Sequence, residues 1–161
     1  KNISFVYELV EIIKKSKKKN YSKKINVCTK TFQALRIFVN KETTELVEGI
    51  IGATKAVKSG GKIIIISFHS IEDKIIKFYF NNYSKNKSKP SRYLPEIKDS
   101  NIFFKDIRSN LLKPNEKEIT KNRSSRSAKL RYVTRNSEEF FKPKELLLKF
   151  KNYLDLEAIY V

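Results

Sequence analysis

Several residue types are rare or absent in this chain, and each shortage excludes a class of site. The 161 residues include one cysteine, Cys28, and one histidine, His69. A disulfide framework within the chain, a cysteine-based metal site and a multi-histidine metal site are therefore excluded, and we expect no metal. The lone cysteine favours a reducing, cytoplasmic compartment. Methionine is absent and the chain begins at Lys1, so we expect a piece of a longer protein.

Glycine is also scarce, and its placement excludes a further class of site. Only four glycines are present, and the one pair, Gly60-Gly61, precedes an apolar run. A phosphate-binding or nucleotide-binding loop needs its glycines after a strand, so no such loop is predicted here. No stretch has the pattern of a signal peptide or of a membrane span.

Positive charge is what the chain has in excess. It carries 35 Lys and Arg against 17 Asp and Glu, a formal net charge of +18. This exceeds what solubility requires and indicates a polyanionic partner. An anionic membrane surface is the alternative, but a membrane binder usually gathers its charge on one amphipathic helix or carries a long apolar segment. Here the charge is spread over helices and loops, so we expect a nucleic acid.

The rest of the chain is organised around residues 60–73. After Gly60-Gly61, the unbroken run Ile63–Ile66 predicts a strand covered on both faces. Ser70 then opens a helix, and Asp73 is placed to complete a capping box with it. Helices on both sides of the strand predict an α/β fold with a doubly wound parallel sheet, in which ligands sit beyond the carboxyl ends of strands.

Apolar spacing predicts the remaining elements. Helices are expected over residues 4–15, 31–58 (one helix or two joined, with a kink or close packing at Gly49 and Gly52), 71–82, 114–122 and from Pro143 onward. Strands over residues 102–112 and 129–135 would form an antiparallel pair at the sheet edge. A basic loop over 14–30 and a mobile loop over 83–100 complete the chain.

The carboxyl end of the central strand carries the candidates for chemistry. A Ser-His-Asp reading of Ser67, His69 and Asp73 is unsafe, because Asp73 serves better as the helix cap. A lone histidine is usually structural, yet this one follows a strand and lies between two serines. We therefore take Ser67, His69 and Ser70 as candidate pocket residues and leave the structural role of His69 open.

Two basic segments are candidates for contacts with a nucleic-acid backbone. The first, residues 30–36, opens a helix with its polar groups close together, and the second, residues 121–135, has six Lys and Arg and no acid. Arginine forks and serine hydroxyls suit phosphate contacts, although a solvated edge loop would have the same composition. The predicted RNA contacts are Lys30, Thr31, Gln33, Arg36, Arg123, Ser124, Arg126, Ser127, Lys129 and Arg131.

Three segments together resemble a known family. Thr31-Phe32-Gln33-Ala34-Leu35-Arg36-Ile37, Ser67-Phe68-His69-Ser70-Ile71-Glu72-Asp73 and Asn122-Arg123-Ser124-Ser125-Arg126-Ser127-Ala128-Lys129-Leu130-Arg131 resemble, in order and spacing, the MraW/RsmH family of bacterial 16S ribosomal RNA cytosine-N4 methyltransferases. The resemblance covers roughly residues 4–135. It implies a Rossmann-like methyltransferase with an inserted helical domain, S-adenosylmethionine as donor, and a cytidine of the small ribosomal subunit as target.

The departures from the family pattern define what this chain would contain. The family's glycine-rich donor loop, its acidic residue for the ribose and its Asp-Leu-Gly-type segment would all lie before Lys1, so no donor-binding residue is expected here. Lys30 stands where the family usually has arginine, and residues 140–161 have no counterpart.

The resemblance divides the chain into three parts. Residues 1–40 would end the inserted helical domain, residues 41–135 would form the later Rossmann-like elements, and residues 136–161 would be a helical extension. The alternative function is a non-catalytic basic module that packs on ribosomal RNA.

Overall fold

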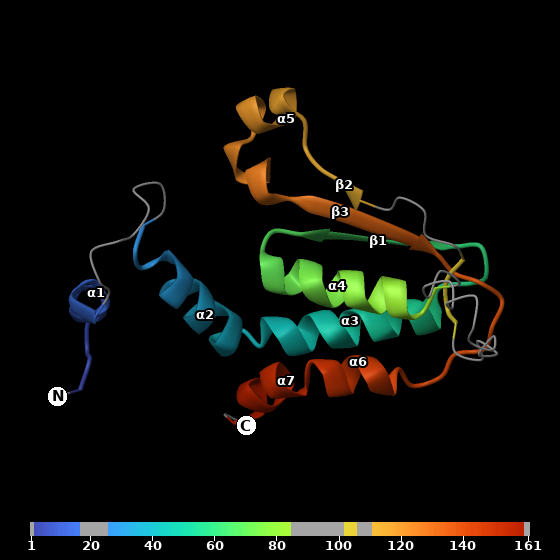
Figure 1. Ribbon diagram of the computed structural model, residues 1–161, viewed down its shortest axis with the longest axis horizontal. Helices are drawn as coiled ribbons and strands as arrows, with labels where there is room; N and C mark the ends of the chain where they lie inside the picture. The colour runs from blue at the N-terminus through green and yellow to red at the C-terminus, as the bar shows by residue number, and fades with distance from the viewer. Residues whose placement is uncertain (1, 17–25, 85–101, 106–110, 160–161) are drawn as a thin grey trace, which may run out of the picture.

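A computed structural model of the chain describes residues 2–16, 26–84, 102–105 and 111–159 (Figure 1). The elements in chain order are α1 (Val6–Ser16), α2 (Thr29–Val39), α3 (Glu42–Ala56), β1 (Lys62–Ser67), α4 (Ser70–Asn82), β2 (Leu111–Leu112), α5 (Glu116–Lys121), the 3-10 helix η1 (Arg123–Ser127), β3 (Lys129–Thr134), α6 (Lys144–Lys149) and α7 (Lys151–Ala158). The predicted helices before β1, the central strand and the helix after it are confirmed. No described helix is both long and apolar enough to cross a membrane.

The sheet differs from the parallel arrangement predicted for it. Its strand order is β1-β3-β2, and both pairings are antiparallel, with Ser67 opposite Lys129 and Leu111 opposite Arg131. The predicted antiparallel pair of the two later strands is confirmed, but β3 lies in the middle of the described sheet and not at its edge. An apolar run predicts a strand without fixing the direction of its neighbour, which is why the sequence pattern did not reveal this pairing.

One face of the sheet is covered by helices. Helix α4 contacts both β1 and β3, and α3 and α6 pack against α4 in turn. In Figure 1 these helices lie below the sheet, whereas α5 lies above it. The buried cluster under the sheet is rich in aromatic side chains and comprises Val47, Ile50, Ile63, Ile75, Ile76, Tyr79, Phe80, Tyr83, Phe103, Phe104, Val133, Leu146 and Phe150.

The other face of β1 is open, contrary to the prediction of a strand covered on both faces. Ile63 and Ser67 are 5% and 1% exposed, whereas Ile64 and Ile66 are 59% and 53% exposed. Because successive side chains of a strand point to opposite faces, the isoleucine run divides into a packed set and an exposed set. Phe68, the next residue of the exposed set, is 56% exposed.

The long helical stretch after the basic loop divides at its middle. Helices α2 and α3 are separated at Lys41, whose φ of 51° is left-handed. The kink expected at Gly49 and Gly52 is absent, and so is the close packing, because a Cβ at either glycine would meet nothing within 4 Å. Lysine is an unusual residue in the left-handed region, so apolar spacing alone did not locate the break.

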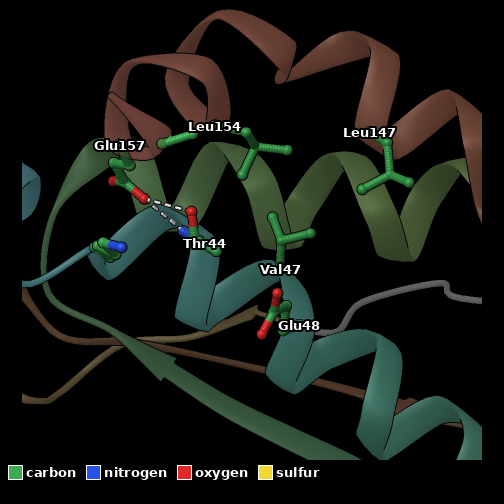
Figure 2. Close-up of a pocket in the computed structure, with 8 residues that line it drawn as sticks. Thr44, Val47, Glu48, Leu147, Leu154 and Glu157 are labelled. Carbon is green, nitrogen blue, oxygen red and sulfur yellow. Dashed lines mark hydrogen bonds between the residues drawn. The ribbon is translucent and has the colours of Figure 1, made fainter. Parts of the chain in front are cut away.

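The carboxyl-terminal segment packs against α3 through a buried carboxylate. The helix predicted from Pro143 is confirmed at its start but is divided into α6 and α7 at Phe150. Glu157 of α7 is 4% exposed and accepts hydrogen bonds from the backbone amides of Thr43 (3.1 Å) and Thr44 (2.8 Å) and from the Thr44 hydroxyl (2.7 Å). Figure 2 shows this carboxylate beside the first turn of α3. The backbone amides of a first turn have no acceptor within the helix, and they favour a negative charge at this position.

Several predictions fall partly outside the described residues. Positions 17–25 of the basic loop, 85–101 of the predicted mobile loop and 106–110 of the predicted strand over 102–112 belong to this group. Of that strand, Phe104 forms single bridges to Ser84 and Arg135, and Leu111–Leu112 forms β2. The short helix predicted over 114–122 is confirmed as α5, which Asn115 caps by accepting the amide of Glu118.

Candidate functional site

The turn that links β1 to α4 is fixed by a capping box. His69 is the N-cap residue, and its Nδ1 accepts the backbone N–H of Glu72 at 3.4 Å. The Glu72 carboxylate accepts in return from the amides of Phe68 (2.9 Å) and His69 (3.3 Å). The predicted box of Ser70 with Asp73 is therefore wrong by one residue. Glutamate is longer than aspartate and can reach the two amides that precede the helix.

The imidazole of His69 also lies between two carboxylates. Its Nε2 is 3.3 Å from Glu72 and 3.6 Å from Glu42, and only 9% of its side chain is exposed. Glu42 is held from its other side by Arg36, whose Nε is 2.7 Å away. Burial disfavours the charge on Glu42, but hydrogen bonds from Arg36 and Asn40 outweigh it, so the pKa of Glu42 is below its ordinary value.

These three side chains bring their ligand atoms close enough together for a metal site. Ligand atoms of Glu42, His69 and Glu72 lie within 4.8 Å of one another. A metal at Nε2 would require the ring proton on Nδ1, yet Nδ1 accepts the Glu72 amide. The arrangement therefore places the proton on Nε2, facing the carboxylates, and we interpret the cluster as one that orients the turn.

Asp73, one residue beyond the capping box, connects α4 to β3. Its carboxylate contacts Lys129 Nζ at 2.7 Å and Arg131 Nε at 2.8 Å. Burial raises the pKa of Asp73, but the hydrogen bonds from Arg131 and Lys129 outweigh this and leave it below its ordinary value. Asp73 thus binds Lys129 and Arg131, two of the predicted RNA contacts, on the face of the sheet that the helices cover. Ser67 lies on that face as well, where its Oγ donates to the Lys129 carbonyl at 3.4 Å.

The remaining predicted RNA contacts lie nearer to solvent. The four on η1 are exposed, namely Arg123, Ser124, Arg126 and Ser127. On α2, Lys30 and Arg36 are exposed, whereas Thr31 and Gln33 are half-buried. The pocket candidate Ser70, at the start of α4, is exposed as well. Asn122 builds η1, because its Oδ1 accepts the amide of Ser124 and its carbonyl accepts both the amide and the hydroxyl of Ser125. The arginines are thereby displayed from a fixed backbone.

A groove joins the turn after β1 to η1. It has a volume of about 450 Å³, and Ile66, Phe68, Leu112, Asn122 and Ser124 are among its lining residues. Two motifs that are about 55 positions apart in sequence therefore meet at one place, because Ser67 and Lys129 are partners in the sheet. Phe68 lines the groove, although the sequence analysis did not include it among the candidate pocket residues. The alternation along β1 could have indicated it, since Phe68 continues the parity of Ile64 and Ile66.

The described residues do not fit a site for S-adenosylmethionine. The amides of Phe68 and His69 are already bound by Glu72, and the carboxylate of Glu42 is already bound by Arg36. Gly60 and Gly61 lie before β1, whereas a nucleotide-type loop follows a strand. The absence of a donor-binding residue from this chain stays a prediction.

Comparison with known proteins gives one consistent family. Residues 1–136 match the MraW methylase family. A relative from Ehrlichia chaffeensis is 42% identical over 135 residues (83% of this chain, 42% of the relative), and one from Agrobacterium fabrum is 39% identical over 123 residues (76% and 35%). A third, from Allorhizobium ampelinum, is 33% identical over 151 residues (94% and 43%). All three are named ribosomal RNA small subunit methyltransferase H.

Helices packed on a small sheet agree with the class of α/β methyltransferases, which in general use S-adenosylmethionine. The chain belongs to the MraW methylase family, as the resemblance of its three motifs predicted. It spans about two fifths of the length of the relatives it matches.

Proposed function

We propose that this chain is the RNA-facing part of an enzyme that methylates the exocyclic N4 amine of a cytidine in small-subunit (16S) ribosomal RNA. The observation that carries the proposal is the meeting of the turn 67–70 with η1 at one groove. Such an enzyme must take a base out of its stack and hold the surrounding backbone. The groove offers a place for a base, and η1 presents exposed arginines beside it.

The proposed division of labour follows from the contacts. Arg123 and Arg126, with Lys30 on α2, would bind phosphates, and the backbone contacts would set the register of the RNA. The network of His69, Glu72 and Glu42 would keep the turn in one conformation, since small displacements of a positioned substrate lower rates strongly. S-adenosylmethionine is the proposed donor of the methyl group, held chiefly by residues outside this chain. The domain boundaries near residues 40 and 135 belong to the same proposal.

The experiment that tests this function uses a protein of the relatives' length that contains this chain. Small subunits that lack the modification are incubated with the protein and S-adenosylmethionine, and the RNA is digested and analysed by mass spectrometry. We expect one new N4-methylcytidine. A methyl group on carbon or ribose, or on no nucleotide at all, would contradict the proposal.

The same assay tests the predicted pocket. His69→Ala should lower the single-turnover rate, because the turn loses its cap and its orientation; His69→Asn should keep most of it, since asparagine is a good N-cap residue. Full activity per folded molecule in the alanine variant would remove His69 from the site.

A non-catalytic RNA-binding module is the second candidate. It is favoured by one observation, namely that η1 displays the exposed side chains of Arg123 and Arg126 from a fixed backbone. Under that alternative the protein of full length would bind small-subunit RNA as tightly without S-adenosylmethionine as with it and would transfer no methyl group.

A further inference from the structure

We propose that the groove beside η1 seats one unstacked base of single-stranded RNA, with the ring of Phe68 as its stacking platform. The inference rests on the proposed function, since it names how that RNA is held. The sequence analysis expected Ser67 and His69 to line the pocket for the base, and the inference assigns the contact with the base to Phe68, which lies between them.

The first argument is the fixed backbone of Phe68. Its two neighbours are engaged by the protein: Ser67 is buried and bonded to β3, and His69 is bound in the capping box. The amide of Phe68 is held by Glu72 at 2.9 Å. Because its backbone is already fixed and its side chain lies on the open face beside the groove, a base that stacks on the ring needs to order only the two side-chain torsions of Phe68.

The second argument is the chemistry of the groove. Ile66, Leu112 and Leu130 make an apolar floor, and Asn122 and Ser124 place an amide and a hydroxyl at its side. A nucleobase has the matching properties, with an apolar face for stacking and a polar edge for hydrogen bonds. An aliphatic ligand would leave the polar side chains without use.

The third argument is charge. Residues 113–129 contain six Lys and Arg and two Glu, so the segment that borders the groove is strongly basic. A base that enters the groove brings its phosphates to this rim, and the exposed Arg123 and Arg126 lie on the rim element itself. Stacking surfaces combined with a basic track are the usual features of single-strand binding.

The alternative occupant of this exposed apolar groove is a protein segment. The two occupants predict different results. A base needs an aromatic ring, whereas a packed protein segment needs any side chain of similar volume. A packed segment would also make Phe68 important for stability in the absence of RNA.

The test uses the protein of full length and a single-stranded RNA with 2-aminopurine, a fluorescent base whose emission is quenched by stacking. Phe68→Ala, Phe68→Leu and Phe68→Trp are compared, with Ile64→Ala as the matched control on the same face of β1. We expect Phe68→Ala and Phe68→Leu to weaken binding about 5- to 150-fold and to abolish protein-induced quenching, since one stack is worth about 1–3 kcal/mol. Phe68→Trp and Ile64→Ala should stay within about twofold.

Three results would overturn the inference: wild-type affinity in Phe68→Ala, equal affinity in Phe68→Leu and wild type, or a fall in melting temperature of the RNA-free Phe68→Ala protein as large as that of a core variant. These are separable from a failure of the proposed function. Wild-type methylation with unchanged binding by Phe68→Ala refutes the base seat alone, whereas absent methylation in the wild type refutes the enzyme and leaves the binding arms to decide the seat.

Discussion

The two faces of strand β1 carry similar residues but differ in burial and in what they contact. Ile63, Ile65 and Ser67 face α4 and the aromatic cluster, while Ile64, Ile66 and then Phe68 lie on the open face. Of these three, Ile66 and Phe68 line the groove. An isoleucine of this strand is therefore packed or exposed according to its parity in the strand. The covered face determines stability, and the open face is where we place RNA recognition.

The largest effect should come from truncating matched isoleucines on these two faces. Ile63→Ala removes a buried side chain from the packed cluster and should lower the free energy of unfolding by about 2–5 kcal/mol. Ile64→Ala, one position along, should change it by less than about 1 kcal/mol. Urea unfolding followed by circular dichroism measures both. Equal losses would mean that the open face is packed too.

The next largest loss of stability should come from Asp73. The sequence indicated a helix cap at this position, but its carboxylate pairs with Lys129 and Arg131 on the covered face of the sheet. Asp73→Asn removes the carboxylate charge that pairs with the buried cation of Arg131, and we expect a loss of about 1.5–3 kcal/mol at pH 7. Because the folded-state pKa of Asp73 is depressed, this stabilisation is present above its unfolded pKa and is lost as the pH falls through the lower folded value.

The pH dependence of this variant provides the sharper measurement. The difference in unfolding free energy between wild type and Asp73→Asn should be largest near neutral pH and shrink below the ordinary value of 3.8. Asp155→Asn, on the exposed side of α7, is the matched control and should show little difference at any pH. A difference for Asp73 that grows on acidification would contradict the assigned ion pair.

The elements with a local signal could be predicted from the sequence, and those that depend on distant partners could not. The isoleucine run predicted β1, and the alternation of apolar and basic residues predicted β3. The cap was misplaced because two overlapping patterns, Ser70 with Asp73 and His69 with Glu72, occupy the same turn. Only the folded contacts show that Asp73 is committed to β3.

The sequence named the segments that carry the candidate site, and the structure brings two of them together at one groove. The sequence interpretation brought the turn after β1 and the arginine-rich segment together only through the family resemblance, and the sheet register now explains their meeting. Arg131 was grouped with Arg123 and Arg126, yet its parity in β3 turns it toward Asp73. The role of Glu157 depends on a contact 114 positions away, which no local pattern encodes.

A smaller effect is expected for Glu157, which lies on the covered side. Glu157→Gln keeps the shape of the side chain but removes the charge that faces the amides of Thr43 and Thr44. The loss should be about 1–2 kcal/mol, the range for a charged group at a helix amino terminus with its hydrogen bonds weakened. Melting curves measure it, with the exposed Glu139→Gln as control. An unchanged melting temperature would show that α7 does not stabilise α3.

The smallest effect on stability should come from the arginines of the open side. Arg123 and Arg126 are exposed on η1, so replacing both with alanine should change the free energy of unfolding by no more than about 0.5 kcal/mol. Their effect should appear in RNA binding, because each phosphate contact in single-stranded RNA contributes about 0.7 to the slope of log K against log salt. The double variant should therefore flatten that slope by about 1.4.

Arg131→Ala and Lys149→Ala give this last prediction its contrast. Arg131→Ala should behave in the opposite way, with a clear loss of stability because Asp73 loses a partner, and little direct effect on the salt slope. Lys149, an exposed cation on α6, should affect neither quantity. If the Arg123 and Arg126 double variant keeps the wild-type slope, or if Lys149→Ala flattens it equally, the charge of the chain acts diffusely, and η1 is not the element that holds the RNA backbone.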